Sequence, residues 1–123
     1  MAHQVSAVDN NRLDLAELAV LRASLHEDRR FRLQQLQDIA RSAADIVETT
    51  SSPDTAAHSE IRHKLAVAAQ TALAETEAAL ARMDAGRYGG CGRCGSTIAL
   101  HRLYAHPQTR YCARCQLFLE MQR

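Results

Sequence analysis

Cys91-Gly-Arg-Cys94 and Cys112-Ala-Arg-Cys115 hold all four cysteines of the chain, and seventeen residues separate the two pairs. Two residues inside each pair is the spacing at which thiolates converge on a tetrahedral zinc ion. Four protein ligands leave no coordination position open for a substrate. We therefore predict one structural Zn²⁺ held by Cys91, Cys94, Cys112 and Cys115.

Other interpretations of these cysteines stay open. His101 or His106 could replace one sulfur, and a redox dithiol or an iron site is a further alternative. A redox motif is usually found in a βαβ context, which the sequence lacks. A disulfide pair would suit a secreted mini-protein, but residues 1–10 have neither the apolar core nor the basic start of a signal peptide. Reduced thiols without an export signal favour a cytoplasmic location.

Composition and charge suggest a small module with an extension. The chain has 123 residues, with 4% aromatic residues and no Trp, which argues against a large globular core. No apolar run approaches the roughly 20 residues of a membrane span, so we expect no membrane partner. Residues 1–85 contain nine Arg/Lys and thirteen Asp/Glu, whereas residues 86–123 contain six Arg and only Glu120. The two parts therefore favour different electrostatic surroundings.

Helical periodicity dominates residues 13–85, which contain no Gly and a single Pro. Residues 49–54, TTSSPD, interrupt the pattern with hydroxyl side chains and Pro53. We predict an antiparallel hairpin over residues 13–85 with its tip near 48–56, preceded by a flexible tail at 1–12. A hairpin that satisfies its own apolar seam should be monomeric. The predicted seam consists of Leu15, Leu18, Leu21, Leu25, Leu36, Ile39, Ala43, Ile46 and Val47, then Ile61, Leu65, Ala68, Ala72, Thr76, Ala79, Leu80 and Met83.

Residues 86–123 form the predicted zinc-finger module. Gly86 suits the end of the second helix, which we expect over residues 55–85. Residues 97–100 are predicted as a short strand and residues 102–104 as extended chain. The second cysteine pair should open a final helix, whose apolar side chains we expect to pack on the finger and on the base of the first helix; these are Leu117, Phe118 and Met121. The predicted fold class is mainly α: a long antiparallel helical hairpin (coiled coil), then a small four-cysteine zinc finger with a C-terminal helix.

The order of these motifs resembles the DksA/TraR zinc-finger family. The resemblance rests on ARMDAGRYGGCGRCGSTI at residues 81–98, RLYAHP at 102–107 and the second cysteine pair. It extends from about residue 18 to the C-terminus, and the finger is its most specific part. The resemblance implies a bacterial transcription regulator that binds RNA polymerase through its secondary channel. It also implies that the protein reads no promoter sequence by itself.

The family's hairpin tip has the form Asp-x-x-Asp-x-Ala. By this resemblance Asp54 is the second acid and Ala56 is the small residue. The first acid falls on Ser51, which carries no charge, and Glu48, one turn earlier, is the acid that could take its place. The resemblance therefore assigns Asp54, Ala56, Glu48 and Ser51 to a polymerase-modulating tip.

Some family members also bind the alarmone ppGpp through cations on the finger and the hairpin. The family arginine just before the proline falls on His106, and the lysine just after the last cysteine falls on Gln116. Losing two permanent charges weakens recognition of a pyrophosphate group. We therefore expect no ppGpp dependence of the best-known kind.

Two other function classes compete with a polymerase regulator. A nucleic-acid-binding zinc ribbon would use the positive finger, and a coiled-coil adaptor would use the finger to recognise another protein. The arginines available to the first alternative are Arg87, Arg93, Arg102, Arg110, Arg114 and Arg123. An enzyme is not expected, because the sequence shows no nucleophile–base constellation and the predicted metal site is saturated.

Overall fold

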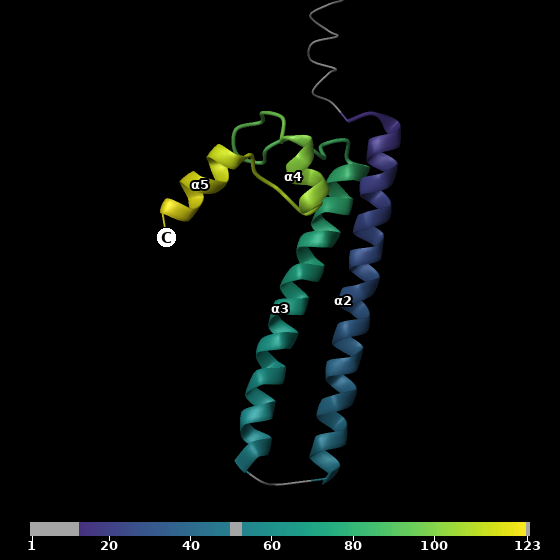
Figure 1. Ribbon diagram of the computed structural model, residues 1–123, viewed down its shortest axis with the longest axis vertical. Helices are drawn as coiled ribbons and strands as arrows, with labels where there is room; N and C mark the ends of the chain where they lie inside the picture. The colour runs from purple at the N-terminus through teal and green to yellow at the C-terminus, as the bar shows by residue number, and fades with distance from the viewer. Residues whose placement is uncertain (1–12, 50–52, 123) are drawn as a thin grey trace, which may run out of the picture.

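The chain is an elongated helical hairpin with a small finger at one end (Figure 1). The computed structural model describes the backbone of residues 13–49 and 53–122 and the side chains of residues 13–44 and 56–122. The predicted tail at 1–12 lies outside the described residues. The helices are α2 (Leu15–Thr49), α3 (Pro53–Asp84), α4 (Leu100–Ala105) and α5 (Ala113–Met121).

Helices α2 and α3 run antiparallel and lie side by side (Figure 1). Their 35 and 32 residues correspond to about 50 Å each at the helical rise of about 1.5 Å per residue. With the cysteine cluster and the C-terminal helix that follow the hairpin, this arrangement confirms the predicted fold class. None of the described helices is long and apolar enough to cross a membrane.

A capping box that the sequence analysis did not identify starts the first helix. The backbone N–H of Glu17 donates to the Asp14 carboxylate at 2.7 Å, and the backbone N–H of Asp14 donates to the Glu17 carboxylate at 2.9 Å. Each side chain thus satisfies a backbone donor that the first helical turn leaves free. The Asp-x-x-Glu spacing before an apolar run was the signal in the sequence.

Helix α3 ends at the glycine that the sequence predicts. Gly86 has φ +74°, a left-handed conformation that costs other residues energy. Its N–H donates to the carbonyl of Met83 at 3.1 Å, and the N–H of Arg87 donates to the carbonyl of Arg82 at 2.8 Å. This pair of bonds is a Schellman motif, which closes the helix and turns the chain into the finger.

One apolar core joins the base of the hairpin to the finger. The hairpin and the finger each contribute half of its buried members, so neither part buries its apolar surface alone. The members are Leu21, Leu25, Ala79, Met83, Cys91, Ile98, Leu103 and Cys115.

The described part of the hairpin buries less than the predicted seam implies. Leu15, Ile61 and Leu65 are exposed. On α3 the predicted seam residue Ala68 is exposed as well, and its neighbour Ala69 is buried instead. The prediction was wrong for these residues because a helical stripe is wider than the line along which two helices touch. Small side chains at the contact bring the helices together but remove little apolar surface from water.

The finger contains a helix where the sequence analysis expected extended chain. Residues 100–105 form α4, and the β structure in the described part of the finger is a single bridge between Gly90 and Thr97. Leu103 is buried in the core, with the partly buried Leu100 one turn before it. The prediction failed because an apolar segment this short fits a strand and a helix equally well.

The final helix packs only in part as predicted: the centre of the Phe118 ring lies 3.9 Å from the guanidinium of Arg93 in the finger. Cys112 precedes α5 in an extended conformation, so the second cysteine pair opens the helix as expected. However, α5 projects away from α2 and α3 (Figure 1), and Leu117, Phe118 and Met121 are 58%, 41% and 77% exposed. The predicted packing against the base of the first helix was therefore wrong.

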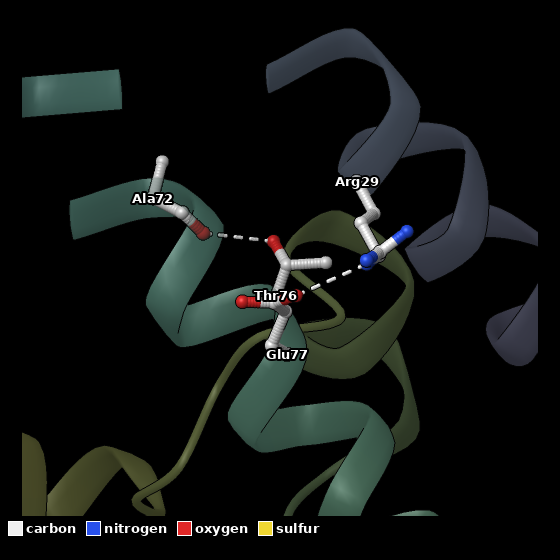
Figure 2. A network of polar contacts seen from close by, with 4 residues as sticks. All are labelled: Arg29, Ala72, Thr76 and Glu77. Atoms are coloured by element: carbon white, nitrogen blue, oxygen red, sulfur yellow. Dashed lines mark hydrogen bonds and ion pairs between the residues drawn. The ribbon is translucent and has the colours of Figure 1, made fainter. Parts of the chain in front are cut away.

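A polar network ties the finger to both long helices. The Gln108 side-chain amide donates to the Asp28 carboxylate of α2 at 2.7 Å and to the Thr76 hydroxyl of α3 at 3.3 Å. The Thr76 hydroxyl in turn donates to the carbonyl of Ala72 at 2.9 Å (Figure 2). Beside it, Arg29 and Glu77 form an ion pair between the helices at 3.1 Å, also drawn in Figure 2. Gln108 therefore connects three segments that are far apart in sequence.

We predict that Gln108→Ala lowers the free energy of unfolding by about 1–3 kcal/mol, because it leaves the half-buried Asp28 carboxylate without its donor. Urea unfolding of the zinc-loaded protein measures this loss. The matched control is Gln116→Ala, which removes a glutamine amide bonded only to the exposed Glu120. Equal stability of the two variants would show that the network does not hold the finger in place.

Candidate metal centre

The structure brings the four predicted cysteine ligands together. Their sulfur atoms all lie within 4.8 Å of one another, and the Sγ atoms of Cys94 and Cys112 are 3.8 Å apart. A tetrahedral zinc site with bonds of about 2.3 Å has sulfur–sulfur edges of about 3.8 Å. The four sulfur donors thus fit one ion of this kind. Neither redox chemistry nor an open coordination position is needed to explain their arrangement.

Backbone hydrogen bonds hold the two cysteine pairs in register. The N–H of Cys91 donates to the carbonyl of Ser96 at 2.7 Å, which closes the first pair into a tight loop. The N–H of Gly92 donates to the carbonyl of Arg110 at 2.9 Å, which joins this loop to the segment leading to Cys112. The second of these bonds holds the segment before α4 against the segment after α4, independently of any metal–ligand bond.

Arg93 contacts both cysteine pairs. Its backbone N–H donates to Cys91 Sγ at 3.5 Å, and its guanidinium donates to Cys115 Sγ at 3.5 Å. The same guanidinium lies 3.9 Å from the centre of the Phe118 ring, which positions it over the sulfurs. A cation beside the sulfurs offsets the negative charge of a four-thiolate site. Sequence spacing alone gave no signal for this role.

The thiols differ in how easily they lose a proton. Burial raises the pKa of Cys91, but backbone N–H groups of Cys112, Cys94 and Arg93 outweigh it and lower that pKa to about 6. The Ser96 hydroxyl, 2.8 Å from Cys94 Sγ, lowers the pKa of Cys94. For Cys115, Arg93 lowers the pKa, but burial and the neighbouring thiols raise it to about 11. Four sulfurs this close become thiolates together only with a cation between them, which is the chemistry of a metal centre.

The histidines between the cysteine pairs lie outside this cluster. His101 and His106 are exposed, and among the described residues the metal-ligating group consists of the four cysteines alone. The geometry therefore favours four sulfur ligands over a substitution by histidine. Gln116, which with His106 is a position that the family resemblance links to ppGpp, is half-buried. Its side-chain amide donates to Glu120 on the same helix.

The predicted tip lies at the end of the hairpin opposite the finger. Glu48 belongs to the last turn of α2 and Asp54 to the first turn of α3, but their side chains lie outside the described residues. Ser51 lies outside the described backbone, and Ala56 is exposed on α3. The assignment of these four residues to a functional tip stays a prediction.

Comparisons with known proteins agree with the geometry of the finger. Residues 86–120 match the family model of the prokaryotic DksA/TraR C4-type zinc finger. An uncharacterised protein of Aquifex aeolicus is 51% identical over 43 residues, which are 35% of this chain and 30% of that protein. The chain therefore matches less than a third of the length of this relative.

The fold of most of the chain is similar to a solved structure. The transcription factor DksA2 from Pseudomonas aeruginosa superimposes with a TM-score of 0.77 at 24% identity, covering 89% of this chain and 87% of that one. At this identity the likeness concerns the fold. Together with the match of the finger, it confirms the resemblance drawn from the sequence.

Proposed function

We propose that this chain, whose residues 86–120 match the DksA/TraR C4-type zinc finger, is a transcription regulator that binds RNA polymerase directly. The observation that carries the proposal is the shared architecture with DksA2, a transcription factor, over nearly the full length of both chains. In this role the protein does no chemistry of its own. It acts where polymerase acts, which places it in the cytoplasm, and it acts as a monomer.

The shape suits entry into a narrow channel. A hairpin of two helices is only about 20 Å across, since each helix with its side chains measures about 10 Å. Its length of about 50 Å carries the tip far from the finger. We propose that the finger stays at the channel mouth while the hairpin passes through the secondary channel.

The charge of the far end supports a role near the catalytic centre of polymerase. No Lys or Arg occurs between Arg41 and Arg62, whereas the same stretch contains Asp45, Glu48, Asp54 and Glu60. We propose that Asp54, with Glu48 in place of the missing acid at Ser51 and with the small Ala56 beside it, approaches cations or basic side chains there and changes the stability of promoter complexes.

The four cysteines would hold the metal ion that this fold uses as a structural element. When bound, Zn²⁺ supplies a rigid tetrahedral link between the two cysteine pairs. The chain's own residues do the rest: the shared core anchors the finger to α2 and α3, and Gln108 fixes its attachment. We propose that this regulator lacks the best-known kind of ppGpp dependence, because Gln116 and His106 occupy the positions of two family cations.

We predict that Asp54→Asn abolishes the effect on transcription while binding to polymerase is unchanged, because the substitution removes one charge at the tip and leaves the finger intact. Co-purification measures binding, and multiple-round transcription with purified polymerase measures the effect. Glu75→Gln is the matched control, since it removes one exposed carboxylate from the same helix near the finger. Absence of polymerase binding at micromolar protein would refute the proposed function.

A further inference from the structure

The two cysteine pairs share one sequence pattern, but the structure uses it differently in each. Both pairs have the form Cys-x-Arg-Cys, so Arg93 and Arg114 occupy equivalent positions. The guanidinium of Arg93 donates to a sulfur atom and lies against an aromatic ring. Within the described part of the chain, Arg114 is exposed and makes neither contact. The two arginines therefore offer a comparison inside one protein, and the proposed contact with polymerase does not involve this difference.

Arg93 joins one sulfur atom of each pair. Its backbone N–H donates to Cys91 Sγ and its guanidinium donates to Cys115 Sγ, both at 3.5 Å. These are the two buried cysteines, whereas Cys94 is exposed and Cys112 is half-buried. A bound metal ion leaves such a centre as its sulfur ligands detach one after another. The ligands that Arg93 contacts are thus the two that solvent reaches least.

The positive charge of Arg93 is directed at the sulfur atoms. Among the described ion pairs, none joins Arg93 to a carboxylate. Four thiolates carry more charge than one divalent ion neutralises, so a metal-loaded centre stays negative. A charge-assisted hydrogen bond to a thiolate is stronger than one between neutral groups. Partners of this kind, which contact the ligands and not the ion, commonly change metal affinity by about 10- to 100-fold.

The same guanidinium connects the centre to α5. It lies 3.9 Å from the centre of the ring of Phe118, one helical turn beyond Cys115. Leu117 and Met121 of this helix are exposed, and α5 projects away from the hairpin (Figure 1). The stack on Arg93 is therefore a contact that α5 makes with the finger in addition to its cysteine ligands. The ring in turn restricts the guanidinium to positions from which it reaches Cys115.

We propose that Arg93 is a positioning residue that slows the release of the metal ion, and that Phe118 acts by holding the Arg93 guanidinium against Cys115. The hydrogen bond makes this thiolate less ready to detach, and the stack keeps the donor in place. The equivalent arginine of the second pair has no such effect. The inference concerns how long the ion stays bound, and it does not depend on the proposed action on RNA polymerase.

Zinc transfer from the full-length, zinc-loaded protein to the chromogenic chelator pyridylazoresorcinol measures the rate of release. Arg93→Gln should release zinc about tenfold faster than the parent. Arg114→Gln is the matched control, because it removes the same charge at the equivalent position of the other pair. Its rate should stay within about twofold of the parent, since an exposed charge without a contact contributes little. Arg93→Lys keeps the charge but not the planar fork, so its rate should lie between those of the parent and Arg93→Gln.

Phe118→Leu tests whether the ring acts through the arginine. This variant keeps an apolar side chain and should release zinc about two- to fivefold faster, which corresponds to the loss of one exposed cation–π contact. In the double variant the guanidinium is already absent, so release should be no faster than in Arg93→Gln alone. Rates that multiply in the double variant would show that Phe118 acts independently of Arg93 and would overturn the proposal.

Cobalt substitution gives a readout that a general loss of stability would not change. In the Co²⁺-loaded protein, the energy of the sulfur-to-cobalt charge-transfer band depends on the hydrogen bonds that the sulfurs accept. Arg93→Gln should shift this band to lower energy, because the Cys115 sulfur loses its cationic donor, whereas Arg114→Gln should leave it unchanged.

Circular dichroism of the zinc-loaded variants checks that each retains the helical content of the parent. If Arg93→Gln does not, Arg93→Lys provides the same comparison with Arg114→Lys. Equal rates of zinc release from the Arg93 and Arg114 variants, or an unchanged charge-transfer band in the Arg93 variant, would overturn the proposal.

Discussion

Removal of the metal ion is expected to unfold the finger and to lower the melting temperature of the hairpin. Zinc binding to small modules contributes an apparent free energy of about 10–16 kcal/mol. The total stability of a protein of this size is about 5–15 kcal/mol. The loss of the ion is therefore comparable to the whole free energy of unfolding, and no other single change should have a larger effect.

The effect should reach α2 and α3 because the core is shared. Leu21 and Leu25 are buried in the same cluster as Ile98 and Leu103, so a disordered finger exposes both hairpin leucines to water. Among the described hairpin side chains farther from the finger, the small Ala69 is the one that is buried. Helical content measured by circular dichroism should therefore fall by more than the contribution of the short finger helices α4 and α5 alone.

Cys94→Ser separates the loss of a ligand from the loss of packing, because the Cys94 side chain is exposed. Zinc content by mass spectrometry, thermal melting and circular dichroism should change in this variant as they do on chelation of the parent. Adding zinc back should restore the chelated parent and not the variant. An unchanged melting temperature after the metal ion is fully removed would show that the finger folds on its apolar core alone.

Local sequence signals predicted the parts of the structure that depend on local chemistry. The hairpin follows from apolar residues at helical spacing on both sides of TTSSPD, and the end of α3 follows from Gly86. The cysteine cluster follows from two short spacings, since each pair must form a loop that presents both sulfurs. The second helix begins at Pro53, two residues before the predicted start, which is within the usual uncertainty of helix ends.

Features decided by tertiary packing were not predictable in the same way. Leu15 and Leu25 share one predicted stripe, but only the contact with the finger determines which of them is buried. The direction of α5 is set by the second cysteine pair, so its composition could not tell whether Phe118 packs on the hairpin. The roles of Arg93 and Gln108 depend on contacts with residues distant in sequence, Cys115 and Asp28.

Leu25→Ala is expected to lower the free energy of unfolding of the zinc-loaded protein by about 2–5 kcal/mol, the range for a fully buried leucine. Leu25 is 0% exposed and lies in the cluster that joins the hairpin to the finger. Its truncation removes apolar contacts from both parts at once. The surrounding chain can relax little, because the four sulfur positions and the Gln108 network hold the finger in place.

Leu15→Ala is the matched control for this prediction, because it makes the same substitution on the same helix at a side chain that is 85% exposed. Its free energy of unfolding should change by no more than about 0.5 kcal/mol, as for other surface substitutions. Both variants should keep one zinc ion per chain, so urea unfolding at saturating zinc compares packing alone. If Leu25→Ala were as stable as Leu15→Ala, the hairpin and the finger would not share a core, and the finger could not transmit its rigidity to the hairpin. The expected drop in hairpin stability on metal removal would then also have to be abandoned, since both predictions depend on the same contact between α2 and the finger.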